Sequence, residues 1–222
     1  FQVAKTNKLL SRNSMSFLTQ KIPQVSVIMN SHNGEDFINQ SIKSIISQNF
    51  KNWELIFWDN CSSDDSKKIV QNFKDKRIRY FYSKKFHNLY KARNLAIRKA
   101  KGKYICFLDV DDQWKKNKIK DQLLLIKNSD TFIVYSNFIM NNKIKKIKKK
   151  RSNSKLPEGK ITQALLNDYF LGINTIMIPR NLFKNYKFNE NYNIIGDFDL
   201  FLRLSLKYEF ICVQKTLAIY NF

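Results

Sequence analysis

The stretch Val25-Ser-Val-Ile-Met-Asn-Ser-His-Asn-Gly-Glu35 decides the fold, because a short apolar run passes through a polar turn into an amphipathic segment. Residues 25–29 are too few for a helix and rich enough in β-branched side chains to predict a buried strand. From residue 35 to residue 48, apolar side chains recur at helical spacing, which predicts a helix with one buried face. A strand that leads directly into a helix is typical of the first half of a β–α–β unit.

The same alternation repeats along the first half of the chain. Further strands are predicted at residues 53–58, 78–82 and 104–108. Ser62 has the hydroxyl of an N-cap residue and opens a second predicted helix, and a third helix over residues 89–100 is expected to end at Gly102. Repeated units of this kind predict right-handed crossovers and a mostly parallel sheet with helices on both faces. We expect the doubly wound strand order 3-2-1-4.

The second half of the sequence is less regular. It predicts helices at residues 115–127, 161–170 and 198–206, and extended segments at residues 131–140, 175–178 and 210–213. Asn141 and Asn142 are typical turn residues, so the basic run after them is expected to return as an antiparallel arm. The expected fold is therefore a Rossmann-like α/β sheet with a smaller antiparallel or mixed half. A lead-in segment at residues 1–24 would precede this single domain of residues 25–222.

Composition excludes several classes of protein. Hydrophobic residues make up 43% and charged residues 26% of the 222, an ordinary globular balance. No apolar run approaches the ~20 residues that a membrane-spanning helix needs. Residues 1–23 lack the continuous apolar core of a secretory signal. The three cysteines, Cys61, Cys106 and Cys212, have no C-x-x-C spacing, which argues against a disulfide framework or a zinc ribbon and predicts a reducing, cytoplasmic compartment.

The net charge of +22, from 40 Lys+Arg and 18 Asp+Glu, has more than one explanation. Lysine and arginine neutralise nucleic-acid phosphates, but the excess here is spread along the chain. Lys, Asn, Ile and Phe are all abundant, as an AT-rich coding sequence would make them, so no nucleic-acid partner is expected. The densest run, Lys143-Ile-Lys-Lys-Ile-Lys-Lys-Lys-Arg151, is either a contact for an anionic surface, such as lipid headgroups or an acidic substrate, or a solvated hairpin arm.

Three polar clusters follow the first, second and fourth predicted strands: Asn30-Ser-His-Asn-Gly-Glu35, Asp59-Asn-Cys-Ser-Ser-Asp64 and Asp109-Val-Asp-Asp112. Ligands of such sheets bind beyond the carboxyl ends of the strands, so the clusters are expected to share one crevice. The sequence has neither a G-x-G-x-x-G fingerprint nor a phosphate loop, which disfavours nicotinamide enzymes and P-loop nucleotidases. The carboxylates of the last cluster repel one another, so they predict either a bound Mg²⁺ or Mn²⁺ or an acidic loop that caps the next helix.

The motifs Val25-Ser-Val-Ile-Met-Asn-Ser-His-Asn33, Trp58-Asp-Asn-Cys-Ser-Ser-Asp64 and Phe107-Leu-Asp-Val-Asp-Asp112 resemble those of family 2 glycosyltransferases of the GT-A fold. The resemblance covers residues 25–114 and continues weakly to residue 220. It implies a nucleotide-diphosphate-sugar donor, an Mn²⁺ or Mg²⁺ cofactor and transfer of the sugar to an acceptor hydroxyl. It also implies a nucleotide-sugar-binding half at residues 25–114 and an acceptor-side half at residues 115–222.

The resemblance assigns roles to particular residues of the first half. The loops after the first and second strands would hold the nucleoside through Asn30, His32, Glu35, Asp59 and Asn60. In the D-x-D run, Asp109 and Asp111 are expected to bind the nucleotide sugar, and Asp111 and Asp112 the metal. Many members carry a second acid where Asn60 stands, which often accepts from a uracil N–H, and a tyrosine where His32 stands. These departures weaken the expectation of a uridine donor.

In the second half, Gly196-Asp-Phe-Asp-Leu-Phe-Leu-Arg203 resembles the family's segment at the acceptor site, with Gly196 in place of the usual glutamate. Asp197 would be the general base of an inverting single displacement, or it would cap the following helix, or both. Asp199 is expected to be structural. Arg93 would either add a positive contact to the donor diphosphate or form a surface ion pair.

The implied setting is synthesis of cell-surface polysaccharide or glycolipid, with a glycan or lipid-linked acceptor. The enzyme would be cytoplasmic, with peripheral contact at the anionic inner face of the membrane. Three other possibilities stay open. One is a nucleotidyltransferase on a related sheet, although its Gly/Arg-rich phosphate loop is missing, and another is a non-enzymatic protein that binds anionic polymers or membranes. The third is a degenerate, inactive transferase, because Asn60 stands where many members carry an acid.

Overall fold

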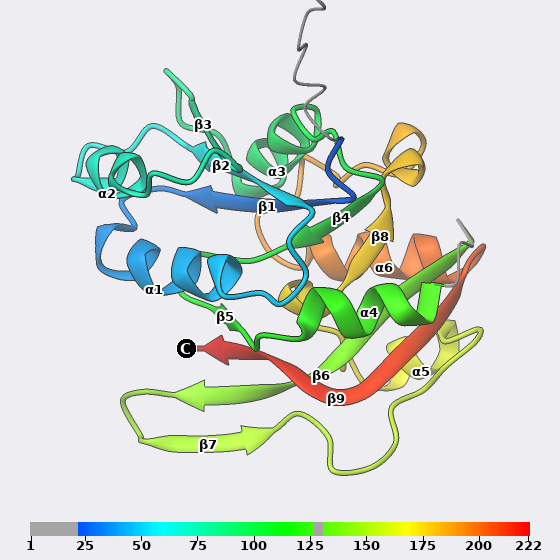
Figure 1. Cartoon of the computed structure of the whole chain (residues 1–222). Helices are drawn as coiled ribbons and strands as arrows, with labels where there is room; N and C mark the ends of the chain where they lie inside the picture. Colours follow the sequence, from blue (N-terminus) through cyan, green and yellow to red (C-terminus); the bar gives the residue numbers. More distant parts are fainter. Residues whose placement is uncertain (1–21, 127–130) are drawn as a thin grey trace, which may run out of the picture.

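One continuous β-sheet runs through the computed structural model, which describes residues 22–126 and 131–222 (Figure 1). Its strands follow the order β3-β2-β1-β4-β8-β6-β9-β5, and β7 pairs with the carboxyl end of β6. Most of the expected lead-in at residues 1–24 lies outside the described residues. The strands are β1 (Val25–Ser31), β2 (Trp53–Asp59), β3 (Ile78–Tyr82), β4 (Tyr104–Phe107), β5 (Gln113–Trp114), β6 (Phe132–Asn142), β7 (Ile147–Lys150), β8 (Met177–Pro179) and β9 (Glu209–Asn221).

Helices cover both faces of this sheet. In the described ranges they are α1 (Glu35–Ile46), α2 (Ser66–Asn72), α3 (Leu89–Ile97), α4 (Lys118–Ile126), α5 (Thr162–Asn167) and α6 (Gly196–Ser205), with short 3₁₀ helices η1 (Ile173–Thr175) and η2 (Arg180–Lys184). Alternate residues of β1 serve opposite faces: Val27 and Met29 pack with α1, α2 and α4, whereas Ile28 packs with α3, α5 and α6. None of the helices in these ranges is long and apolar enough to cross a bilayer.

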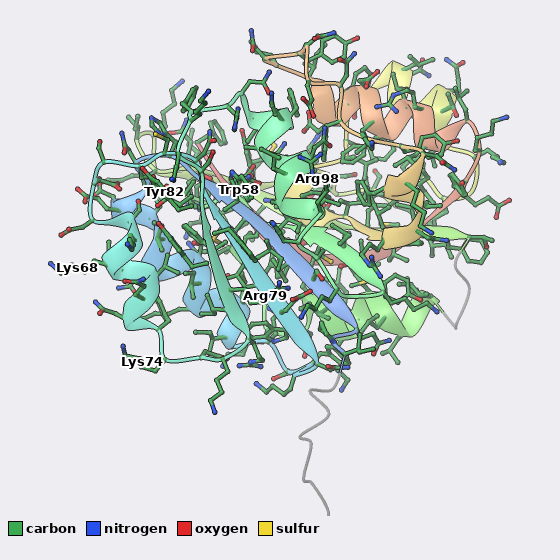
Figure 2. The ribbon with its side chains drawn as sticks, turned by 90° about the horizontal axis from the view of Figure 1, so that it is seen from above. Trp58, Lys68, Lys74, Arg79, Tyr82 and Arg98 are labelled. Carbon is green, nitrogen blue, oxygen red and sulfur yellow. The ribbon has the colours of Figure 1, made fainter. Side chains whose placement is uncertain are left out.

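The first four strands are parallel and lie in the order 3-2-1-4, as their alternation with helices predicts. The register sets Ser31 opposite Asp59 and Asp59 opposite Tyr82, so β1, β2 and β3 end at one edge. Figure 2 shows Trp58 and Tyr82 near this edge, with Arg79 farther back along β3. The expected common edge for the polar clusters is therefore present.

The second half continues the same sheet with strands of mixed direction. β8 is antiparallel to β4, and β6 is antiparallel to β8 but parallel to β9. The predicted antiparallel arm is confirmed, but β6 extends through Asn142, so the turn lies at residues 143–146 instead of at the two asparagines. The strand predicted at residues 210–213 is longer, because β9 continues beside β6 as far as Asn221.

Several predicted helix ends are wrong for local reasons. α2 begins at Ser66 instead of near Ser62, because the Ser62 N–H donates to the Asp59 carboxylate at 2.8 Å and is held in a turn. α4 begins at Lys118, and α5 ends at Asn167, after which Phe170 enters the core. α3 ends at Ile97, so Gly102 is not its C′ residue.

Gly102 instead permits a close approach between the start of β4 and the start of β1. A Cβ atom at this position would lie 2.6 Å from the backbone nitrogen of Ser26. The Gly102 N–H also donates to the Ser26 hydroxyl at 2.8 Å. The glycine is required by backbone packing within the sheet.

Gly102→Ala is expected to lower the free energy of unfolding by about 1–3 kcal/mol, because the added methyl group must displace backbone in a packed sheet. Urea denaturation followed by circular dichroism measures this change. Lys101→Ala, which alters the exposed neighbouring side chain, is the matched control and should change stability much less. Equal stabilities for the two variants would contradict the close approach.

Candidate active site

The three polar clusters meet beyond the carboxyl ends of β1, β2 and β4. The backbone N–H of Asn60 donates to the Ser31 carbonyl at 2.7 Å, which joins the first two clusters. The third cluster lies against the first, because a Cβ atom on Gly34 would approach the Val110 side chain at 3.3 Å. The side-chain Nδ2 of Asn30 is buried here without a hydrogen-bond partner in the part of the chain that the structure describes. The three clusters therefore lie side by side at this edge of the sheet.

Asn60 holds the loop that precedes α3. Its Nδ2 donates to the His87 carbonyl at 2.7 Å, and its Oδ1 accepts from the His87 N–H at 3.2 Å. The His32 ring lies on the other side of this residue, with Nδ1 3.0 Å from the Asn60 carbonyl. The same ring meets Phe86 edge-on at 4.7 Å between centroids. Asn60 thus joins two loops through hydrogen bonds, and the rings of His32 and Phe86 form an aromatic wall beside it.

Asp59 is buried and bonded internally. One carboxylate oxygen accepts from the Ser62 N–H at 2.8 Å, and the other accepts from the Tyr80 hydroxyl at 2.5 Å. Burial and the adjacent Asp59 carboxylate raise the pKa of Tyr80, so its hydroxyl stays a donor. The two hydrogen bonds of the Asp59 carboxylate therefore hold the second loop in its conformation.

Glu35 has a similar role between two helices. Its carboxylate accepts from the Asp65 N–H at 2.8 Å, while its own N–H donates to Asp64 at 3.0 Å. Burial raises the pKa of Asp64, but hydrogen bonds from Ser66 and Glu35 outweigh it and hold this pKa below its ordinary value. These two reciprocal hydrogen bonds satisfy backbone N–H groups at the beginnings of α1 and α2, and they hold the first loop in place.

Arg93 and Asp109 form an ion pair at the end of β4. Arg93 is only 3% exposed, and its Nη2 lies 2.7 and 3.0 Å from the two carboxylate oxygens of Asp109. The guanidinium also lies near the rings of Tyr90 and Phe188, at 5.9 and 5.7 Å from their centroids. The alternative that Arg93 forms an ion pair on the surface is therefore wrong.

Asp112 is enclosed by protein. It is 0% exposed, its Oδ1 accepts from the Asn221 N–H at 2.9 Å, and its Oδ2 accepts from Asn174 Nδ2 at 2.6 Å. Burial, with the nearby charge of Asp109, raises the pKa of Asp112 to about 8. Both oxygens are committed to β9 and η1, so the expectation that Asp112 is a metal ligand does not fit this geometry.

Asp111 is the carboxylate of this cluster that fits a metal ion. Its side chain is half-buried, and burial together with the charge of Asp109 raises its pKa, so a cation beside it would relieve an unfavourable charge. In the described residues no group of three or more His, Cys, Asp and Glu side chains is arranged to hold a metal. Magnesium is commonly held by one or two carboxylates together with substrate phosphates, a pattern that Asp111 satisfies.

A pocket of about 320 Å³ joins the end of β4 to the start of α6. Asp109 and Arg93 line it from the first half of the chain, and Asp197 lines it from the second. Tyr169 lines the same pocket, and burial together with the nearby Asp197 carboxylate raises the pKa of Tyr169. The pocket therefore places the Asp197 carboxylate opposite the acidic cluster, with the Tyr169 side chain beside it.

Local packing explains the glycine before Asp197. A Cβ atom on Gly196 would lie 2.6 Å from the ring of Tyr90. Ile195, just before it, has a φ angle of 57°, which turns the chain sharply into α6. Asp199 pairs with Arg203 at 2.8 Å one turn along α6, in agreement with a structural role.

Sequence reasoning missed three tyrosines and an arginine among the residues that line the pocket. Tyr90, Tyr169 and Tyr220 contribute rings, and Arg151 contributes a second cation. No motif surrounds the tyrosines, and Arg151 looked like the last residue of a basic run. Only the fold brings these residues together.

Comparison with known proteins identifies the family. The model of "Glycosyl transferase family 2" matches residues 26–205. The putative teichuronic acid biosynthesis glycosyltransferase TuaG of Bacillus subtilis (strain 168) is 40% identical over 108 residues, which are 48% of this chain and 43% of TuaG. The UDP-Glc:alpha-D-GlcNAc-diphosphoundecaprenol beta-1,3-glucosyltransferase WfgD of Escherichia coli is 34% identical over 165 residues, which are 74% of this chain and 63% of WfgD. The chain thus spans less than two thirds of the length of either relative.

Solved structures support the fold. TarS 1–349 of S. aureus in complex with UDP superposes with a TM-score of 0.72 at 19% identity, over 90% of this chain and 60% of TarS. The mannosyltransferase PcManGT from Pyrobaculum calidifontis, in complex with GDP-Man and Mn²⁺, gives a TM-score of 0.68 at 14% identity, over 90% of this chain and 57% of that one. At these identities the likeness shows the GT-A fold alone. With a family match that covers most of its length, the chain belongs to glycosyltransferase family 2.

Proposed function

We propose that this chain transfers a sugar from a nucleotide-diphosphate sugar to an acceptor hydroxyl in one inverting displacement. The observation that supports this most directly is the single pocket lined by both Asp109 and Asp197. Donor and acceptor would meet there, as a displacement requires. Family membership favours a transferase over two of the alternatives, a nucleotidyltransferase and a non-enzymatic binder.

Asp197 is the proposed general base. The acceptor oxygen bonds to the anomeric carbon as the bond from that carbon to the diphosphate oxygen breaks, and the electron pair leaves with the diphosphate. The proton of the acceptor hydroxyl passes to the Asp197 carboxylate. Tyr169 lines the pocket beside Asp197, and its hydroxyl is proposed to orient this carboxylate.

The donor is proposed to bind through the first half, residues 25–114. Asn30 and the wall of His32 and Phe86 would receive the nucleoside, while Arg93 keeps Asp109 in place beside the sugar-diphosphate. A bound Mn²⁺ or Mg²⁺ would stabilise the negative charge of the leaving diphosphate. Asp111 would hold it, with donor phosphates as further ligands.

The acceptor is proposed to be a lipid-linked sugar bound by the second half, residues 115–222. WfgD is named for an acceptor in which GlcNAc is joined through a diphosphate to undecaprenol, and TuaG is named for teichuronic acid biosynthesis. A role in bacterial cell-surface polysaccharide or glycolipid synthesis is in keeping with both names. Such an acceptor would bring the enzyme to the inner face of the membrane, where the basic run Lys143–Arg151 would favour anionic lipid.

Asp197→Asn is expected to lower kcat by about 10²–10⁴-fold, because the amide cannot accept the acceptor proton. Product release from a UDP-sugar donor measures this loss, and nuclear magnetic resonance of the product reports the anomer. Asp199→Asn, in the same turn of α6, is the matched control and should retain nearly all activity. A retained anomeric configuration, or full activity of Asp197→Asn, would refute the displacement.

Asp111→Asn is expected to remove the strengthening of UDP binding by Mn²⁺, because the proposed metal would lose its protein carboxylate. Isothermal titration of UDP with and without Mn²⁺ measures how much the metal strengthens UDP binding, which is the increment compared between variants. Asp65→Asn, which neutralises an exposed acid at the start of α2, should keep the full increment. If Asp111→Asn binds Mn²⁺ and UDP as the parent does, the assignment of Asp111 is wrong.

Asn60→Asp restores the acid that many family members carry, and it is expected to destabilise this chain. The new carboxylate oxygen would face the His87 carbonyl at the present donor distance of 2.7 Å, which replaces a hydrogen bond with repulsion. A loss of about 1–3 kcal/mol is expected for a buried partner left unsatisfied. Thermal denaturation checks this loss, with Asn39→Asp on the exposed face of α1 as the control. Unchanged stability of Asn60→Asp would contradict the role of Asn60 in joining the two loops.

A further inference from the structure

Arg151 lines the active-site pocket from the base of the β6–β7 arm. Its backbone N–H donates to the Phe138 carbonyl at 2.9 Å, and its guanidinium contacts Asp168 and the Tyr169 carbonyl. The side chain of Asp168 is 61% exposed, so this ion pair lies at the rim and water screens it. By contrast, Arg93 is enclosed and committed to Asp109. Arg151 is thus the arginine of the pocket that can exchange its partner for an incoming anion.

The strand register of the β6–β7 arm places a second cation on the same side as Arg151. Met140 and Phe138 both line the pocket, and they are two residues apart on β6, so they share one face. Lys149 lies opposite Met140, and directly opposed residues of an antiparallel pair share a face. Lys149 and Arg151 therefore belong to the pocket face of the arm. Lys148 and Lys150 lie opposite Asn141 and Ile139 and belong to the other face.

The same face becomes apolar beyond Lys149. Ile147 lies opposite Asn142 and is 53% exposed, and Ile144 in the turn is 90% exposed. Alternate residues of a strand are about 6.6 Å apart, so Arg151, Lys149 and Ile147 form a track of about 13 Å that starts at the pocket. Residues 131–157 contain no Asp or Glu, so no acid within this segment offsets its cations.

The arm is also held at its tip. The Lys143 ammonium lies 5.5 Å from the centroid of the Phe37 ring on α1. The backbone hydrogen bond of Arg151 fixes the base of the arm and the Lys143 contact holds its tip, so the arm is positioned before any ligand arrives. A positioned cationic track loses less entropy on binding than a mobile one.

We propose that Arg151 and Lys149 bind the diphosphate of an acceptor in which this group joins the sugar to a lipid, and that Ile147 and Ile144 meet the start of the hydrocarbon chain. The order along the track matches the order of groups in such a molecule: sugar at Asp197, then phosphates, then hydrocarbon. The planar fork of arginine suits phosphate oxygens, and lysine adds a second charge. The inference rests on the lipid-linked acceptor of the proposed function.

The test is binding of farnesyl diphosphate to the protein already saturated with UDP and Mn²⁺, so that the donor site is occupied. Isothermal titration compares two double variants of equal charge, Arg151→Gln with Lys149→Gln and Lys150→Gln with Lys148→Gln. The first pair is expected to raise the Kd by about tenfold or more, because charged hydrogen bonds are lost. The second pair removes the same charge from the opposite face and should raise it far less. Arg151→Lys, which keeps the charge without the fork, should fall between the parent and the first pair.

Each alternative result overturns the inference. Equal weakening by both pairs would mean that net charge alone attracts the ligand, and no weakening by either would mean that it binds elsewhere. Loss of binding to phosphatidylglycerol vesicles with unchanged binding of farnesyl diphosphate would make the arm a membrane contact instead. Binding of UDP and of GDP is measured first in every variant. If neither binds to the parent, the proposed donor site is refuted, whereas binding of either one without binding of farnesyl diphosphate refutes the acceptor subsite only.

Discussion

The structure depends on how the charge of three aspartates at the end of β4 is compensated. Three carboxylates within four residues repel one another, and Asp112 is carried fully into the protein interior. Arg93 compensates Asp109 directly, with its Nη2 at 2.7 and 3.0 Å from the two oxygens. Asp112 is held by Asn174 and by the backbone of Asn221, and its pKa is raised to about 8. Asp111 is left half-buried with its charge exposed to the crevice, which is where an added cation would be most stabilising.

The partners of these aspartates also connect the two halves of the chain. Asn174 and Asn221 belong to η1 and β9, so the acidic loop is locked to elements that come late in the sequence. Arg93 lies on α3 beside the stacked rings of Tyr90 and Phe188, and Tyr90 packs against Gly196 at the start of α6. A displacement of Asp109 would therefore disturb the helix that carries Asp197. A buried ion pair of this kind contributes to positioning more than to net stability.

The sequence predicted the parts of the fold that local patterns specify. The strands before each polar cluster are short, apolar and flanked by turn residues, so their existence and parallel direction followed from alternation, whereas their order was taken from the doubly wound precedent. β5 has only two residues and exists because the end of β9 pairs with it, which no local pattern indicates. The burial of Asp112 depends on Asn174, 62 residues away, and on Asn221, 109 residues away. Asp111 and Asp112 look alike in the sequence, and tertiary contacts alone distinguish them.

Two departures from the family's motifs have local physical reasons. Asn60 replaces an acid, and in this chain it both donates to and accepts from the backbone of His87, which a carboxylate cannot do. Gly196 replaces a glutamate, and the Tyr90 ring occupies the space that any side chain there would need. Each substitution is thus matched by a neighbour from α3 or from the loop before it. That loop and α3 also carry Phe86 and Arg93, so one stretch of the chain supplies the neighbours of Asn60 and Gly196, a ring of the aromatic wall and the partner of Asp109.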